Sequence, residues 1–385
     1  MTASNANDEG AGRALAWVEH LRSGGSTPWI DFRGTSSGSG RREVPGAAQL
    51  ELARRLNAAD PVADGVHREL VDRILSASVP GRGQLDLDLV GVPQASPFGA
   101  PPVDPADIAP DELIRVAVGA LAEALVRLDP GAPRKRFAAR LRHRLRHRRP
   151  WRRGLRLAGD PLAVAGVRAA LARRGHITGR RRPVVVVLAD DLGVMLADIW
   201  TNRLRNGRTA IWAGWLEKVE RNDALPPALE LPDVLERKAA EVGAANVHVV
   251  VGDPGAEIAR LLGLRMPLEA DPPRLPPDAL EVVREVNAVL RVLVHPERHR
   301  RILHDLLLPR MADGPGIPRG VPAEREDWVR RQAERLRTRL STAGYRVHGD
   351  LDDLLPREGG GAPAPSESRV LDVALRTLLK TKECM

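Results

Sequence analysis

The sequence predicts an α/β protein in which a parallel β-sheet with flanking helices follows a helical N-terminal unit. The sheet prediction rests first on two runs of mostly β-branched residues, at 183–188 (PVVVVL) and 246–251 (NVHVVV). Uninterrupted apolar runs of this length are typical of strands buried on both faces of a parallel sheet. Between and after these runs, apolar residues recur at helical spacing. This alternation of strands and helices indicates βαβ units.

Residues 1–45 are expected to form a flexible N-terminal segment. They contain one short amphipathic stretch, at 14–21, followed by Gly- and Ser-rich residues at 34–40. Gly/Ser-rich sequences behave as flexible linkers because they have little apolar surface to bury.

Residues 46–130 are predicted to be a helical unit. Apolar residues at helical spacing run through 47–56 and again through 66–75, with Asp60-Pro61 between them, which indicates a helical hairpin. After a Pro-rich passage, a third helix is expected over 111–128.

Residues 154–356 are predicted to hold the parallel sheet, and residues 357–385 a linker and a tail helix. The region from 277 to about 355 is expected to be mostly helical, and the tail helix to cover 370–379. The elements expected before it are a strand at 154–158, a helix at 162–171, a strand at 183–188, helices near 191–205, 212–219 and 232–242, a strand at 246–251 and a helix at 256–262.

The bulk composition excludes several classes of protein. At 385 residues and 43% apolar content, the chain can bury a substantial core. No apolar run approaches the roughly 18 residues of a membrane-spanning helix, and the first residues do not resemble a secretory signal. The single cysteine, Cys384, has no second thiol with which to form a disulfide or a metal site. We therefore expect a cytoplasmic protein.

The net charge of +9 has a local origin. Residues 134–153, within the junction 131–153, contain eleven Arg or Lys and no carboxylate, so the rest of the chain sums to 9 − 11 = −2. Three interpretations stay open: a solvated basic connector, a contact with a polyanion or an anionic membrane surface, and nucleic-acid reading. Nothing else in the sequence supports sequence-specific nucleic-acid recognition. The residues expected to touch a polyanion or a membrane surface are Arg140, Arg144, Arg148, Arg149, Arg152 and Arg153.

Three passages, at 184–200, 246–251 and 322–351, give residues 154–356 a resemblance to actinobacterial sulfotransferase-like proteins. The resemblance implies a nucleotide-binding parallel sheet related to P-loop enzymes, with 3′-phosphoadenylyl sulfate as the sulfonate donor. It also implies two phosphate-binding turns at the starts of helices, where amides and cations hold the donor. A context in surface-polysaccharide modification follows from the resemblance alone.

Both implied phosphate sites depart from the family pattern. The first turn reads Gly159-Asp160-Pro161, which lacks a cation and a hydroxyl and places a carboxylate where the phosphate would lie. The second reads Ala189-Asp190-Asp191, again with carboxylates in place of Arg and Ser. Aspartates at these positions are expected to act as helix N-caps, because a carboxylate accepts hydrogen bonds from the unpaired amides of the first turn.

The sequence therefore favours a non-catalytic, degenerate sulfotransferase-like protein that acts as a binding or accessory module and has no catalytic residues. The alternative is an active sulfotransferase with a displaced phosphate site. In that alternative Gly159 and arginines outside the two turns bind the cofactor. The arginines proposed for this role are Arg156, Arg180, Arg181 and Arg182, together with Arg152 and Arg153. If the alternative holds, guanidinium groups should converge near Gly159 and Ala189.

Other candidate motifs favour structural roles. His295, His299 and His304 have a spacing that could suit a metal, but Pro296 separates the first two and no carboxylate stands at the position of a third ligand. No metal site is predicted. No Gly-x-Ser-x-Gly turn follows a predicted strand, so a serine hydrolase is not expected. Core packing is the expected use of Trp200, Trp212 and Trp215.

Overall fold

The computed structural model describes residues 2–34, 45–61, 64–76, 89–90, 103–129, 154–175, 184–311, 316–357 and 361–382. The chain divides into two compact units. We call residues 1–129, 281–311 and 365–385 the helical unit, and residues 130–280 and 312–364 the sheet unit.

This division differs from the boundaries drawn on the sequence, which placed 154–356 in one domain and the tail helix in a separate segment. The spacing of apolar residues shows which face of a helix is buried but not which partner buries it. For this reason the tail helix and residues 281–311 could not be assigned to the helical unit from sequence.

The helical unit begins with α1 (Thr2–Arg22), which is longer than the stretch predicted at 14–21. The hairpin predicted over 47–75 is confirmed as α2 (Ala47–Ala59) and α3 (Gly65–Ser76). Other elements of this unit are α4 (Pro110–Leu128), α11 (Pro277–Leu293, from Glu281 onward), α12 (Pro296–Ile302), a π-helical turn (Leu303–Leu307), α13 (Leu308–Met311) and α15 (Glu367–Lys382), with short 3₁₀ turns at Trp29–Asp31 and Pro105–Asp107.

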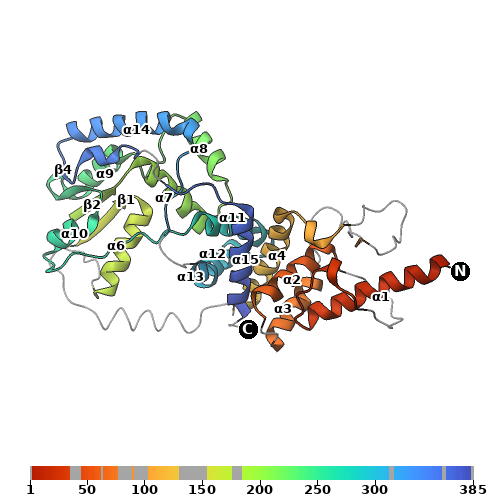
Figure 1. Cartoon of the computed structure of the whole chain (residues 1–385). Helices are drawn as coiled ribbons and strands as arrows, with labels where there is room; N and C mark the ends of the chain where they lie inside the picture. The colour runs from red at the N-terminus through yellow and green to blue at the C-terminus, as the bar shows by residue number, and fades with distance from the viewer. Residues whose placement is uncertain are drawn as a thin grey trace. The chain divides into compact units, whose positions relative to one another are not determined.

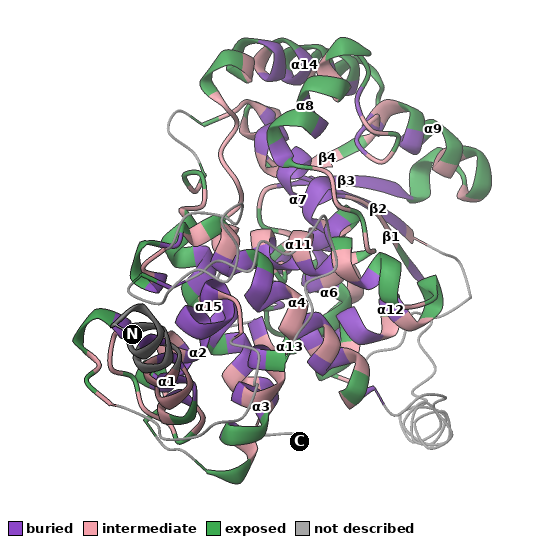
Figure 2. Ribbon diagram, turned by 90° about the vertical axis from the view of Figure 1, so that its right-hand side faces the viewer, coloured by how far each residue is buried: buried purple, intermediate pink, exposed green. Residues whose placement is uncertain are grey.

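The core of the helical unit is centred on α4 and α15, which pack side by side (Figure 1). In α15 the buried residues Val370, Leu371, Ala374, Leu375 and Leu378 recur at the spacing of one helix face. Together with buried leucines and valines of α4 and α2, they form the apolar interior of this unit, shown in purple in Figure 2.

The sheet unit contains four parallel strands whose spatial order follows the sequence: β1 (Leu155–Gly159), β2 (Val184–Ala189), β3 (Val247–Val251) and β4 (Arg346–His348). The strands predicted at 154–158, 183–188 and 246–251 are confirmed. The two long apolar runs form β2 and β3, the central strands. Val185, Val186, Val187 and Leu188 are all buried, as expected where both faces of the sheet are covered.

Helices cover both faces of this sheet (Figures 1 and 2). On one face, α6 (Pro161–Arg173) and α10 (Pro254–Leu262) pack over Val186, Leu188 and Val250. On the other lies α9 (Leu231–Val242), which contacts β1, β2 and β3. The remaining elements of the unit are α7 (Leu192–Arg205), α8 (Trp212–Arg221), α14 (Ala323–Thr342) and 3₁₀ turns at Ala244–Asn246 and Leu351–Leu354.

No helix in the described ranges is both long and apolar enough to cross a membrane.

Candidate functional site

The carboxyl ends of the strands form the edge of the sheet at which α/β proteins usually bind ligands. Three strands of this sheet are followed within two residues by an aspartate that opens the next helix, and the predicted N-caps are confirmed. Asp160 Oδ1 accepts a hydrogen bond from the Leu162 amide at 2.9 Å. Asp191 Oδ1 accepts one from the Gly193 amide at 2.7 Å, and Asp253 caps α10 in the same way.

These caps occupy the positions at which a helix would bind an external anion. The amides of the first turn and the positive end of the helix dipole already face a carboxylate of the chain itself. Asp191 is the most fully engaged, because its Oδ2 atom also accepts a hydrogen bond from the Arg357 amide at 2.8 Å. The Gly193 and Val194 amides at the start of α7 are therefore already bonded and do not face an external phosphate in the manner of a P-loop.

Gly159, predicted to bind a cofactor, has a structural reason to be glycine. Its φ of +91° lies in a region that side chains rarely adopt, and a Cβ atom there would lie 2.1 Å from the Leu188 carbonyl oxygen. The turn that it forms brings the Asp160 amide within 3.1 Å of the same oxygen. Gly159 thus allows β1 to turn into α6 tightly against β2.

A buried cluster of two carboxyls and one guanidinium lies behind this edge. Asp198, on α7, is 1% exposed, and Arg274 approaches it with Nε at 2.9 and 3.1 Å and Nη2 at 2.6 Å from its oxygens. Asp160 is 0% exposed and lies beside Asp198. Burial and the neighbouring Asp198 carboxylate raise the pKa of Asp160 well above its usual range.

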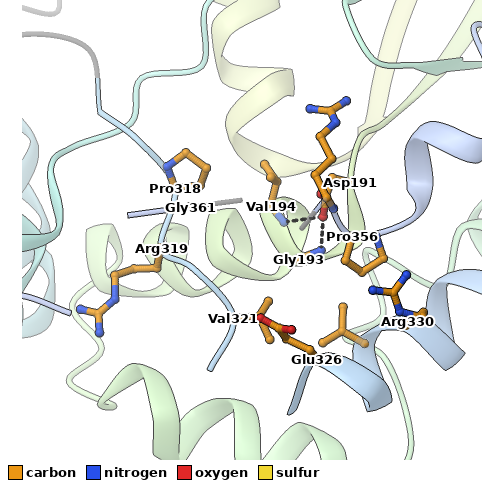
Figure 3. Close-up of a pocket in the computed structure, with 12 residues that line it drawn as sticks. Asp191, Gly193, Val194, Pro318, Arg319, Val321, Glu326, Arg330, Pro356 and Gly361 are labelled. Atoms are coloured by element: carbon orange, nitrogen blue, oxygen red, sulfur yellow. Dashed lines mark hydrogen bonds between the residues drawn. The ribbon is translucent and has the colours of Figure 1, made fainter. Parts of the chain in front are cut away.

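A pocket opens next to the start of α7 (Figure 3). Its cavity volume is about 30 Å³, which compares with roughly 10–15 Å³ for one water on the same measure, so it admits one small chemical group and not a nucleotide. In Figure 3, Arg319 and Arg330 lie on opposite sides of the pocket, with Glu326 between them. Its lining comprises Asp191, Gly193, Val194, Pro318, Arg319, Val321, Glu326, Val329, Arg330, Pro356, Arg357 and Gly361.

The arginines at this edge are not those predicted from the sequence. Arg156 lies three residues before Gly159 in β1 and pairs with Glu241 on α9 at 3.0 Å. The structure instead brings Arg274 to the buried aspartates, and Arg319, Arg330 and Arg357 to the pocket. These arginines lie in loops or on a helix and belong to none of the motifs considered in the sequence. Outside the described residues lie Arg180, Arg181 and Arg182 and the basic set Arg140, Arg144, Arg148, Arg149, Arg152 and Arg153.

A pair of histidines lies elsewhere on the sheet, between β3 and β4. The Nδ1 atom of His248 is 2.9 Å from Nε2 of His348, and His348 Nδ1 is 3.0 Å from a Glu257 oxygen on α10. In the part of the chain that the structure describes, no three His, Cys, Asp or Glu side chains are arranged to hold a metal ion. Of the three histidines considered from sequence, His299 is buried and its Nε2 lies 2.9 Å from Asn287 Oδ1, which is a structural contact.

The predicted packing role of the tryptophans is confirmed. The rings of Trp200 and Trp212, and those of Trp212 and Trp215, lie 5.6 Å apart, and all three side chains are buried. The two inner indoles donate hydrogen bonds to backbone carbonyls, Trp200 to Ala210 at 2.8 Å and Trp212 to Gly320 at 3.0 Å.

Comparison of the chain with protein-family models, with curated proteins and with solved structures gives no match.

Proposed function

We propose that the chain is a binding or accessory protein without sulfotransferase activity, and that its sheet unit holds a small anionic group in the pocket beside α7. The proposal rests on the hydrogen bonds made by the first-turn amides of α6 and α7. Asp160 and Asp191 accept hydrogen bonds from the first-turn amides of α6 and α7, where a sulfonate donor would place its phosphates. This agrees with a sulfotransferase-like ancestor whose phosphate sites have been lost.

Electrostatics argue against a donor nucleotide at these turns. Two like charges about 4 Å apart repel by about 4 kcal/mol at a surface-like effective dielectric. A phosphate would meet this repulsion at the start of α7, where Asp190 and Asp191 lie. At both helix starts it would also find first-turn amides already bonded to an aspartate side chain. The pocket is also too small for a nucleotide.

The pocket can instead recognise a single carboxylate or phosphate group through side chains. Arginine is suited to such recognition because its planar guanidinium matches both oxyanions. Three arginines and two carboxylates line the pocket, and one of the carboxylates, Asp191, accepts hydrogen bonds from three backbone amides. Arg330 is half-buried on α14 and, within the described part of the chain, has no carboxylate at ion-pair distance. It is the residue that we expect to contact the ligand most directly.

Two calorimetric titrations test this proposal. Adenosine 3′,5′-bisphosphate, the product of the sulfonate donor, is expected to give no heat at millimolar concentration. Micromolar binding that disappears when Arg156 and Arg180 to Arg182 are changed to glutamine would instead establish the sulfotransferase alternative.

The second titration uses inorganic phosphate. Weak, millimolar binding is expected, and Arg330→Gln should abolish it. The matched control is Arg335→Gln, because Arg335 lies on the same helix, is exposed and pairs with Asp223 outside the pocket. No phosphate binding by the unaltered protein, or equal binding by both variants, would contradict a role for the pocket.

A second candidate function, contact with a polyanion or an anionic membrane surface, is favoured by the segregation of charge. Eleven cations without a carboxylate in residues 134–153 would release counterions on binding, which makes the affinity fall steeply with salt. This candidate does not exclude the first, since it uses a different part of the chain.

Its test is co-sedimentation with heparin beads and, separately, with vesicles containing anionic lipid, across a salt series. Replacing Arg140, Arg144, Arg148, Arg149, Arg152 and Arg153 with glutamine should abolish binding. A control with the same change in charge replaces six exposed arginines elsewhere, namely Arg68, Arg168, Arg221, Arg237, Arg260 and Arg346. Equal losses in the two variants would show a non-specific effect of net charge.

A further inference from the structure

One oxygen of Asp160 is buried without a hydrogen-bond partner. The Oδ1 atom accepts the first-turn amides of α6, from Leu162 at 2.9 Å and Ala163 at 3.4 Å. The Oδ2 atom has no donor within hydrogen-bond distance, although the residue is entirely shielded from solvent. An ionised carboxylate in this position would carry charge on an atom that neither water nor the protein stabilises.

The groups that face Asp160 come from three directions. The start of α6 supplies amides, α7 supplies Asp198, and the loop before α11 supplies Arg274. Asp190, just before α7, adds a further negative charge that acts on Asp198 and Arg274. Arg274 directs both Nε and Nη2 at Asp198, so its guanidinium is matched to that carboxylate and not to Asp160. Two buried carboxyls therefore share a single cation.

We infer that Asp160 keeps its proton at neutral pH and donates it from Oδ2 to Asp198, so that the cluster is a neutral acid, a carboxylate and a guanidinium with no net charge. In this arrangement every oxygen of the pair has a partner. Burial raises the pKa of Asp198 as well, but Arg274 opposes that rise, and Asp198 is therefore the member of the pair that ionises. The proton makes a buried acid pair compatible with one arginine.

The proton also makes the stability of this part of the sheet unit fall as the pH rises above the ordinary carboxyl range. Because the pKa of Asp160 is raised in the folded protein, the folded chain binds more protons than the unfolded chain above the ordinary carboxyl range. Stability is therefore lost as the pH rises, until Asp160 has ionised. Loss of the proton would repel Asp198 and disturb Arg274, whose backbone packs closely against Gly316 at the start of the segment that lines the pocket.

The first test is infrared spectroscopy of the full chain. A protonated carboxylic acid has a C=O stretch that is distinct from the bands of carboxylates and amides. The unaltered protein should show this band at neutral pH, where ordinary carboxyls are ionised. The band should be missing in Asp160→Asn and present in Asp191→Asn, which alters the equivalent cap of α7. Absence of the band at neutral pH in the unaltered protein, or its persistence in Asp160→Asn, would overturn the inference.

The second test is thermal unfolding across a pH series. Asparagine at position 160 keeps the helix cap and can donate an N–H to Asp198 without a proton that can be lost. Asp160→Asn should therefore match or exceed the melting temperature of the unaltered protein, with an advantage that grows toward alkaline pH. Asp198→Asn, which removes the partner of Arg274, should lower the melting temperature. A pH-independent loss of stability in Asp160→Asn would show that Asp160 is ionised in the fold.

Discussion

The two units neutralise their buried carboxylates in opposite ways. In the helical unit, Glu51 is held by Arg54 and Arg55, both at 2.7 Å. Asp129 is held by Arg298 and Arg301 at 2.9 and 3.0 Å. Each buried acid therefore has two guanidinium groups.

In the sheet unit the ratio is reversed, because Asp160 and Asp198 share Arg274. A buried ion pair is costly to form and more costly to leave incomplete. The helical unit has cations in excess, so that the loss of one leaves the acid paired. The cluster of Asp160 and Asp198 has only Arg274 and depends on a proton. The two units should therefore respond differently to the loss of a single arginine and to pH.

The largest effect is expected from the removal of Arg274. Arg274→Met should destabilise the protein by about 3–5 kcal/mol, because it leaves a buried carboxylate with no cation. The measurement is urea unfolding at neutral pH. Arg260→Met is the control, because Arg260 is 63% exposed and pairs with Glu257 on a helix surface, where only a slight loss of stability is expected. Similar losses in the two variants would mean that Asp198 does not need its cation.

The next largest effect concerns the turn that places Asp160. Gly159→Ala should cost about 3 kcal/mol, because it combines a left-handed backbone with a clash against the Leu188 carbonyl oxygen. Gly175→Ala separates the two causes. Gly175 has a φ of +71° but open space around it, so this variant should lose only about 1 kcal/mol. Thermal unfolding of both variants decides whether the close approach to β2 is essential.

A smaller effect is expected when one of the two arginines that pair with Asp129 in the helical unit is removed. Arg298→Ala should cost less than about 1 kcal/mol, because Arg301 still holds Asp129 and the Arg298 side chain is 37% exposed. Asp129→Ala should cost about 1–2 kcal/mol, because both arginines lose their acceptor but remain partly hydrated. Urea unfolding of the two single variants and the double variant measures the difference. If Arg298→Ala lost as much stability as Asp129→Ala, Arg301 alone would not be sufficient to stabilise the Asp129 carboxylate.

The smallest effect is a dependence on pH opposite to that of Asp160. His67 and His299 are buried in the helical unit, and each places Nε2 near an asparagine Oδ1, at 2.6 and 2.9 Å. Burial lowers the pKa of both rings, so the unfolded chain binds protons first and stability falls as the pH drops below about 6.5.

Hydrogen exchange at pH 5 and pH 7 checks this in α3 and α12, which carry the two histidines. After correction for the intrinsic exchange rate at each pH, the free energy of opening there should be lower at pH 5 than at pH 7, by about 1 kcal/mol per histidine or less. His67→Gln and His299→Gln should remove that difference. An equal free energy of opening at the two pH values in the unaltered protein would show that these rings do not titrate on opening.

The sequence predicted those structural features that depend on residues close together in the chain. The long β-branched runs predicted β2 and β3, and the aspartates after the strands predicted the caps of α6 and α7, because both depend on neighbouring residues. The pairing of Arg274 with Asp198 could not be predicted. The two residues are separated by 76 positions, and neither belongs to a recognisable motif.

The same limit applies to the pocket and to the helical core. Four separate stretches of chain line the pocket, and only the start of α7 was considered as a ligand site from the sequence. The packing of α15 on α4 joins helices from distant parts of the chain. A pattern of apolar residues fixes the face that is buried, but the identity of its partner is set by the tertiary fold.

The division into units has a consequence for any attempt to dissect the molecule. The chain passes from one unit to the other after residues 129, 280, 311 and 364, so neither unit is a continuous stretch of sequence. During synthesis, β3 is made almost 100 residues before its neighbour β4. The edge of β3 that pairs with β4 therefore stays unpaired until β4 has been made. No single cut releases either unit whole, and a fragment ending at residue 280 would lack β4, α14 and most of the pocket lining.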